Sequence, residues 1–202
     1  KIAPLSDYLT LAEQYNGVIW IDDAHGVGIL GENGKGSYEH AGLKSDRLYM
    51  GATLSKAFGA YGGIIPGKAD FINRIKSGSV MTGSNAPMNA AVAAGIKGFE
   101  LVKNNPMMRE KLWENASYLK EGLKAIGIDT DDNSRPIVAF APGDVANMTS
   151  IHQALMDEGI FIQFVKYRGS GSDGVLRIVV FSTHTRDQID YLCHKLGSIE
   201  LL

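Results

Sequence analysis

Hydrophobic and polar positions follow two patterns along this chain: short apolar runs, and segments with apolar residues at helical spacing. The continuous run over residues 18–21 is typical of a strand buried on both faces. Other short runs predict strands over residues 48–51, 62–65, 137–140, 160–165 and 175–181. Helical spacing predicts helices over residues 6–15, 69–76, 106–126 and 148–158, a buried helix over 88–102, and a last helix from Thr185.

Polar residues at the expected helix starts add local signals. Ser6 and Asp7 can cap the first helix, and Pro106 fits the first turn of its helix. Thr185 and Gln188 have the spacing of a capping box. Strands and helices alternate in the first part, which predicts an α/β fold with a parallel sheet, and the remainder predicts a smaller α+β unit. The polar segment 129–136 therefore divides residues 1–128, part of a large domain, from a small C-terminal domain, 129–202.

Composition narrows the classes of protein. The chain has 202 residues, 45% of them hydrophobic, and a net charge of −2. We expect no nucleic-acid partner, because no Lys/Arg run is present, and no membrane span, because no apolar run approaches ~18 residues. The one cysteine, Cys193, excludes an internal disulfide and fits a reducing, cytoplasmic compartment. We expect no signal peptide, and the start at Lys1, directly in a helix pattern, suggests a piece of a longer protein.

Lys56 is the only charged residue between Leu48 and Gly67. Among Gly, Ala and apolar side chains we expect it to be buried, which would lower its pKa and leave a neutral amine near pH 7. Such an amine can form a Schiff base with an aldehyde or ketone. The alternative is a snorkelling lysine at a loop.

Polar residues follow two of the predicted strands. Asp22 comes at the carboxyl end of the first strand, where open α/β sheets place ligands, and His25 follows three positions later. Thr53 and Ser55 flank Lys56 after the next strand, where their hydroxyls could hold a phosphate. The alternatives are a helix-cap carboxylate, a structural histidine and a Thr/Ser turn. A third metal ligand with convincing spacing is missing, so we expect no metal.

The segment 26–31 matches the dinucleotide-binding pattern G-x-G-x-x-G. That function requires a helix to begin inside the motif, whereas the sequence that follows, residues 32–36, breaks a helix. We therefore interpret the glycines as loop geometry.

Arg177 interrupts a strand that is otherwise apolar on both faces. A largely buried guanidinium requires an anion, and its fork suits a carboxylate. A structural ion pair is the alternative. Arg135 is a weaker candidate, because the polar segment can expose it.

Together these segments resemble the fold-type I pyridoxal 5'-phosphate (PLP) enzymes and, within them, the α-oxoamine synthases. Three segments carry the resemblance: Asp22-Asp23-Ala24-His25-Gly26-x-Gly28 with Gly31-x-x-Gly34-x-Gly36; Gly51-Ala52-Thr53-Leu54-Ser55-Lys56-Ala57 with Gly62-Gly63; and Leu176-Arg177-Ile178 with His184-Thr185. The sequence departs from the family pattern at Ala52, since many members have Gly and Thr adjacent there.

The resemblance implies a role for each residue. Lys56 would bind PLP covalently and move the substrate Cα proton, Asp22 would pair with the pyridine nitrogen, and His25 would bind the phenolic oxygen and orient the thioester. The phosphate would be held by Thr53 and Ser55, and by Thr82 of the neighbouring subunit in a homodimer. Arg177 would bind the amino-acid carboxylate.

The family joins a small amino acid to an acyl-CoA, usually with loss of CO2. A PLP aminotransferase and a non-catalytic partner subunit are the alternatives, although the latter would be expected to lose Lys56. The resemblance also implies that the N-terminal half of the large domain is absent, so we expect these residues alone to bind PLP weakly or not at all and to be inactive.

Overall fold

The computed structural model describes residues 2–130, 135–167 and 170–199. The chain separates into two compact units, one up to Arg109 and one from Glu110 onward. This division lies within the helix α5 (Pro106–Ala125), and the expected domain boundary after residue 128 stays a prediction. Part of the predicted polar linker, residues 131–134, and part of the loop expected at 168–174 lie outside the described residues.

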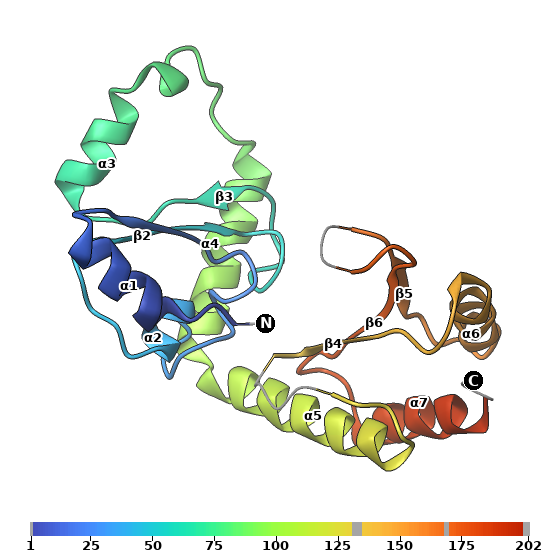
Figure 1. Cartoon of the computed structure of the whole chain (residues 1–202). Coiled ribbons are helices and arrows are strands. Elements are labelled where there is room, and N and C mark those ends of the chain that lie inside the picture. The colour runs from blue at the N-terminus through green and yellow to red at the C-terminus, as the bar shows by residue number, and fades with distance from the viewer. Residues whose placement is uncertain (1, 131–134, 168–169, 200–202) are drawn as a thin grey trace. The chain divides into compact units, whose positions relative to one another are not determined.

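The first unit contains a three-stranded sheet with the order β1-β2-β3, of which β2 and β3 are labelled in Figure 1. The strands β1 (Ile19–Asp22) and β2 (Leu48–Thr53) are parallel, and β3 (Gly63–Ile64) pairs antiparallel with β2. The parallel arrangement of the first two predicted strands is therefore confirmed. The helices of this unit are α1 (Leu5–Gln14), α2 (Ser37–His40), α3 (Ala69–Lys76), the 3-10 turn η1 (Ser79–Met81) and α4 (Asn89–Asn104).

Helix α3 packs on the first unit's sheet through an aromatic side chain, and the burial predicted for β1 and α4 differs from what the structure shows. The ring of Phe71 in α3 packs near two rings of the sheet, with ring centroids 4.5 Å apart for Tyr49 and 6.5 Å apart for Trp20. Trp20 is nevertheless 53% exposed, so the expectation that β1 is buried on both faces was wrong. The expected burial of α4 was also wrong, because only Gly95 of that helix is buried.

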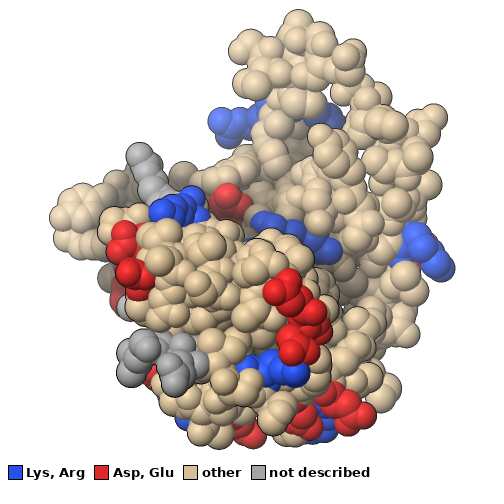
Figure 2. All heavy atoms as spheres, turned by 90° about the vertical axis from the view of Figure 1, so that its right-hand side faces the viewer, with Lys and Arg blue, Asp and Glu red and all other residues tan. Residues whose placement is uncertain are grey.

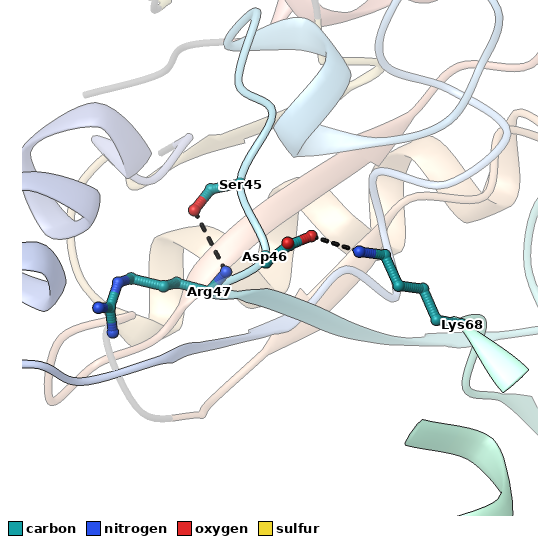
Figure 3. A network of polar contacts seen from close by, with 4 residues as sticks. All are labelled: Ser45, Asp46, Arg47 and Lys68. Carbon is teal, nitrogen blue, oxygen red and sulfur yellow. Dashed lines mark hydrogen bonds and ion pairs between the residues drawn. The ribbon is translucent and has the colours of Figure 1, made fainter. Parts of the chain in front are cut away.

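A turn before β2 contacts other segments of the first unit, and Figure 3 shows its bonds within the turn and to Lys68. Arg47 donates to the Gly17 carbonyl at 2.8 Å and to Asn16 Oδ1 at 3.0 Å, which ties the α1–β1 turn to the start of β2. Lys68, just before α3, forms an ion pair with Asp46 at 2.6 Å, but both side chains are at least 80% exposed. Such an exposed pair contributes about 0–1 kcal/mol. The Arg47 contacts are therefore the better explanation of how this turn positions β2.

The second unit has an antiparallel sheet with the order β4-β6-β5. Its strands are β4 (Ile137–Phe140), β5 (Gln163–Val165) and β6 (Val175–Val179), and its other helices are α6 (Val145–Asp157) and α7 (Arg186–Ser198). Side chains from the sheet and the helices of this unit form its core: Leu119, Leu123, Met148, Ile151, Leu155, Leu176 and Leu196 are each at most 1% exposed. The small α+β unit predicted from the sequence is thus observed.

The cap predicted at the start of α7 was correct, and the cap predicted at the start of α1 was wrong. Thr185 forms the predicted capping box with Gln188. By contrast, α1 begins at Leu5 after Pro4 and has no side-chain cap, so the cap expected at Ser6 and Asp7 was wrong. Proline at that position already fixes the backbone angle φ, and Asp7 lies inside the first turn instead.

The described helices include none that is both long and apolar enough to cross a membrane. On the face shown in Figure 2, acidic and basic side chains are scattered between broad uncharged areas.

Candidate active site

The parallel pairing of β1 and β2 brings two of the predicted polar segments to the same edge of the sheet. Asp22 at the end of β1 is in register with Gly51, and the Asp23 N–H donates to the Gly51 carbonyl at 2.8 Å. His25 follows β1, and Lys56 follows β2, on the turn after Thr53. Parallel strands end at a common edge, which is where α/β sheets bind ligands.

Lys56 and His25 are in direct contact at this edge. Lys56 Nζ lies 3.0 Å from His25 Nε2, although the two residues are 31 positions apart in the sequence. At this distance one nitrogen donates and the other accepts, so either a lysine ammonium donates to the imidazole or a protonated Nε2 donates to the neutral amine. The contact thus places a primary amine beside an imidazole at this edge.

Lys56 is exposed, and the expectation that it is buried was wrong. The Gly and Ala residues around it have too little side chain to cover an ammonium group, and Ser55 and Gly59 beside it are exposed as well. The Lys56 amine therefore lacks the burial that would favour its neutral form in the chain as described. Its contact with His25 is what distinguishes this lysine.

The adjacent carboxylates Asp22 and Asp23 have different environments. Asp23 is 3% exposed, and its two oxygens accept hydrogen bonds from the Ser37 N–H at 2.7 Å and the Ser37 hydroxyl at 2.5 Å. Asp22 is exposed and accepts a 3.3 Å bond from the Ala24 N–H. Asp23 is therefore committed to holding the loop, while Asp22 retains acceptor capacity for a ligand.

The glycine-rich segment after β1 is a series of turns, which confirms its interpretation as loop geometry. No helix begins within residues 26–31; the next one, α2, starts at Ser37. Gly28 and Gly31 both have φ of 84°, a backbone conformation that residues with a Cβ rarely adopt. Glu39 also fixes this loop, because its carboxylate accepts bonds from the Asn33 side-chain amide at 2.8 Å and from the Asn33 and Lys35 N–H groups at 3.1 and 2.9 Å. Partial burial opposes the charged form of Glu39, but these bonds, led by the one from the Asn33 side chain, leave its pKa lowered.

The hydroxyl of Thr53 is engaged within the chain. Thr53 Oγ1 donates to the Gly62 carbonyl at 3.2 Å and accepts from the Ser55 N–H at 3.1 Å. These bonds close the turn that carries Lys56. A phosphate held by Thr53 would have to replace the bond to Gly62, whereas the exposed Ser55 side chain needs no such exchange.

Two further predicted site residues lie elsewhere. Thr82 is exposed directly after η1, and no hydrogen bond in the described part of the chain joins it to Lys56 or His25. Arg177 lies in the second unit, where it is half-buried and donates to Gln163 Oε1 at 2.7 Å. The expectation that Arg177 is largely buried was wrong for this chain. Its hydrogen-bond partner is a neutral amide on the neighbouring strand, and its role toward a carboxylate stays a prediction.

A hollow of about 310 Å³ in the first unit is lined by residues such as Ile21, Tyr38 and Tyr49. None of the predicted site residues lines it. Among the residues that the structure describes, no group of three His, Cys, Asp or Glu side chains could hold a metal ion.

Sequence reasoning missed the structural role of Asp23 and Glu39. Gly26 and Gly36 are the sequence features linked to Asp23, because a Cβ at either position would collide with its carboxylate. The sequence alone does not reveal this link, since the two glycines are ten positions apart and meet the same carboxylate only in the folded loop.

Comparisons with known proteins bear on the family of this chain. The family model for aminotransferase class I and II matches residues 1–196. An 8-amino-7-oxononanoate synthase of Thermosipho melanesiensis is 33% identical over 98% of this chain and 51% of its own length, and one of Thermoanaerobacter pseudethanolicus is 35% identical over 94% and 48%. The chain therefore spans about half the length of the curated relatives it matches.

Solved structures give the same result. A serine palmitoyltransferase with PLP superposes with a TM-score of 0.90 at 26% identity, over 98% of this chain and 51% of that one. An 8-amino-7-oxononanoate synthase from Francisella tularensis, at 19% identity and a TM-score of 0.80 over 94% of this chain and 57% of its own, supports the fold alone. These findings confirm the expected fold class and, at the level of the family, the expected cofactor. The chain belongs to the aminotransferase class I and II family, in which it is of the α-oxoamine synthase type among the fold-type I PLP-dependent enzymes.

Proposed function

We propose that the full-length protein containing this chain is a PLP-dependent acyltransferase. It condenses glycine, alanine or serine with an acyl-CoA and releases CoA, in most cases with loss of CO2. The observation that carries the proposal is the 3.0 Å contact between Lys56 Nζ and His25 Nε2 at the common edge of two parallel strands. The names of the relatives support the choice of acyl transfer.

The side chains at this edge have the chemistry that PLP requires. Lys56 supplies a primary amine for the aldehyde, and Asp22 has acceptor capacity for a protonated ring nitrogen. Ser55 and, after exchange of its internal bond, Thr53 would hold the phosphate, with Thr82 reaching it from a second subunit of a homodimer. When bound, PLP supplies an electron sink for the charge left at the substrate Cα.

The chain's own groups would perform the proton transfers and the binding. The Lys56 amine would remove the Cα proton, because an amine in contact with an imidazole can pass its own proton on and return to the neutral form. His25 would then be available to orient the thioester carbonyl. Arg177 would bind the amino-acid carboxylate through its planar fork.

The isolated chain would provide only part of this site. Lys56, His25 and Asp22 are all exposed, whereas catalysis of this kind requires a site from which water is excluded. We propose that other residues of the full-length protein, or of a second subunit, cover them, and that the 202 residues alone bind PLP weakly and are inactive. A cytoplasmic location accompanies the proposal.

The test is to measure release of free CoA by the full-length protein with PLP and three substrate pairs: glycine with acetyl-CoA, alanine with pimeloyl-CoA and serine with palmitoyl-CoA. We expect thiol release with at least one pair and a loss of about 100- to 10,000-fold in the variant Lys56→Ala. The family model also covers aminotransferases. Amino-group transfer to a keto acid without thiol release would therefore contradict acyl transfer, and failure to bind PLP would favour a non-catalytic partner subunit.

A further inference from the structure

Arg177 and Gln163 form a polar pair on one face of the sheet in the second unit. In this sheet, Arg177 of β6 is in register with Gln163 of β5 on one side and with Ala139 of β4 on the other. Side chains alternate between faces along a strand, and the neighbours Leu176 and Ile178 are buried at 0% and 4% exposure. Arg177 and Gln163 therefore point to the face opposite the core.

The rest of that face carries no polar side chain in the paired rows that the structure describes. The rows on either side of Arg177 pair Val175 with Val165 and Val179 with Ile137. Ala139 is too short to reach the guanidinium. Gln163 is thus the neighbour on this face that can hydrogen-bond Arg177.

The contact itself fixes the guanidinium without neutralising it. Arg177 Nη1 donates to Gln163 Oε1 at 2.7 Å, and both residues are half-buried. Among the described residues no carboxylate lies within 4 Å of Arg177, and the guanidinium has four further N–H groups beyond the one used. A neutral amide restricts the orientation of the fork, whereas a carboxylate in the same place would form an ion pair and occupy it.

We propose that Gln163 is a positioning residue that determines specificity for carboxylate substrates. It holds the Arg177 guanidinium in one orientation and leaves its positive charge available to the carboxylate of the amino acid. This inference rests on the function proposed above for Arg177.

The first test compares kinetics in the full-length protein. Gln163→Leu removes the acceptor and should raise KM for the amino acid about tenfold, the effect of one hydrogen bond to a charged group, with kcat changed less than about twofold. Gln163→Glu should raise KM further, because the new carboxylate competes with the substrate. The matched control is Gln153→Leu in α6, where the exposed Gln153 amide donates to Asp157 at 2.8 Å. A purely structural role would instead lower the melting temperature and leave KM unchanged.

The second test does not depend on turnover. In full-length protein without PLP, the side-chain Nε–Hε NMR signal of Arg177, assigned with Arg177→Lys, should shift on titration with acetate. The shift should be smaller in Gln163→Leu, absent in Gln163→Glu and unchanged in Gln153→Leu. If no CoA is released by the wild type, the proposed function fails while this shift still decides the role of Gln163. Equal shifts in all variants, or no shift in the wild type, would overturn the inference.

Discussion

Alanine substitutions at two glycines of α4 test how this helix supports the segment that carries Lys56. A Cβ on Gly98 would overlap the carbonyl oxygen of Phe58 and lie 2.9 Å from its carbonyl carbon. Phe58 is only two residues after Lys56. A Cβ on Gly95, one turn earlier, would meet the end of the Leu54 side chain at 3.2 Å. The two sites thus differ in whether a flexible side chain or rigid backbone must move.

The expected magnitudes follow from this difference. Replacing glycine by alanine inside a helix gains about 1 kcal/mol of stability. Overpacking costs about 1–3 kcal/mol, and we take the upper end for Gly98 because backbone cannot rotate away. Gly98→Ala should therefore lose about 2 kcal/mol, whereas Gly95→Ala should be neutral or gain up to about 1 kcal/mol.

The assay is urea unfolding of the full-length variants without PLP, followed by circular dichroism, together with titration of each variant with PLP. We expect a lower unfolding midpoint and weaker PLP binding for Gly98→Ala only, because relief of the overlap must displace the Phe58 backbone. Equal midpoints for the two variants would show that α4 does not pack against this segment as described.

Three further predictions concern contacts and burial that support the fold. Ser37→Ala should cost about 1.5–3 kcal/mol, measured by urea unfolding, because it removes a hydrogen bond to the buried Asp23 carboxylate; an unchanged midpoint would contradict that role. Thr185→Ala should lower stability by about 1 kcal/mol through loss of the capping box, whereas Thr149→Ala within α6 should change it less. Burial raises the pKa of the Cys193 thiol, so it should react slowly with iodoacetamide at pH 7–8 in the folded protein and rapidly in urea. The raised pKa also favours folding below the pKa of the unfolded thiol, a contribution lost as pH rises through the folded value.

Local signals in the sequence predicted the elements well. The helix at residues 69–76 and the strand at 137–140 have the expected bounds, because apolar spacing and flanking breakers specify both. The proximity of His25 and Lys56 was also predictable in outline. Two parallel strands place whatever follows them at the same edge, and the sequence places a histidine and a lysine there.

Burial was predicted poorly, for a physical reason. Trp20, Lys56 and the apolar residues of α4 were expected to be covered, yet Trp20, Lys56 and most of the apolar residues of α4 are exposed in the chain as described. Apolar composition indicates that burial of a segment would be favourable, but it does not show which other residues would bury that segment. The partner of Arg177 was missed in a similar way, because the register of β5 against β6, which selects Gln163, depends on the loop between the strands.

The central claim is that the Lys56 amine binds the aldehyde of PLP, and one measurement tests it directly. Full-length protein incubated with PLP is reduced with borohydride, digested, and mapped by peptide mass spectrometry. The account predicts a pyridoxyl group on Lys56 and none on Lys68, an exposed lysine of the same unit that is paired with Asp46. Modification of another lysine in place of Lys56, or of none, would contradict the account.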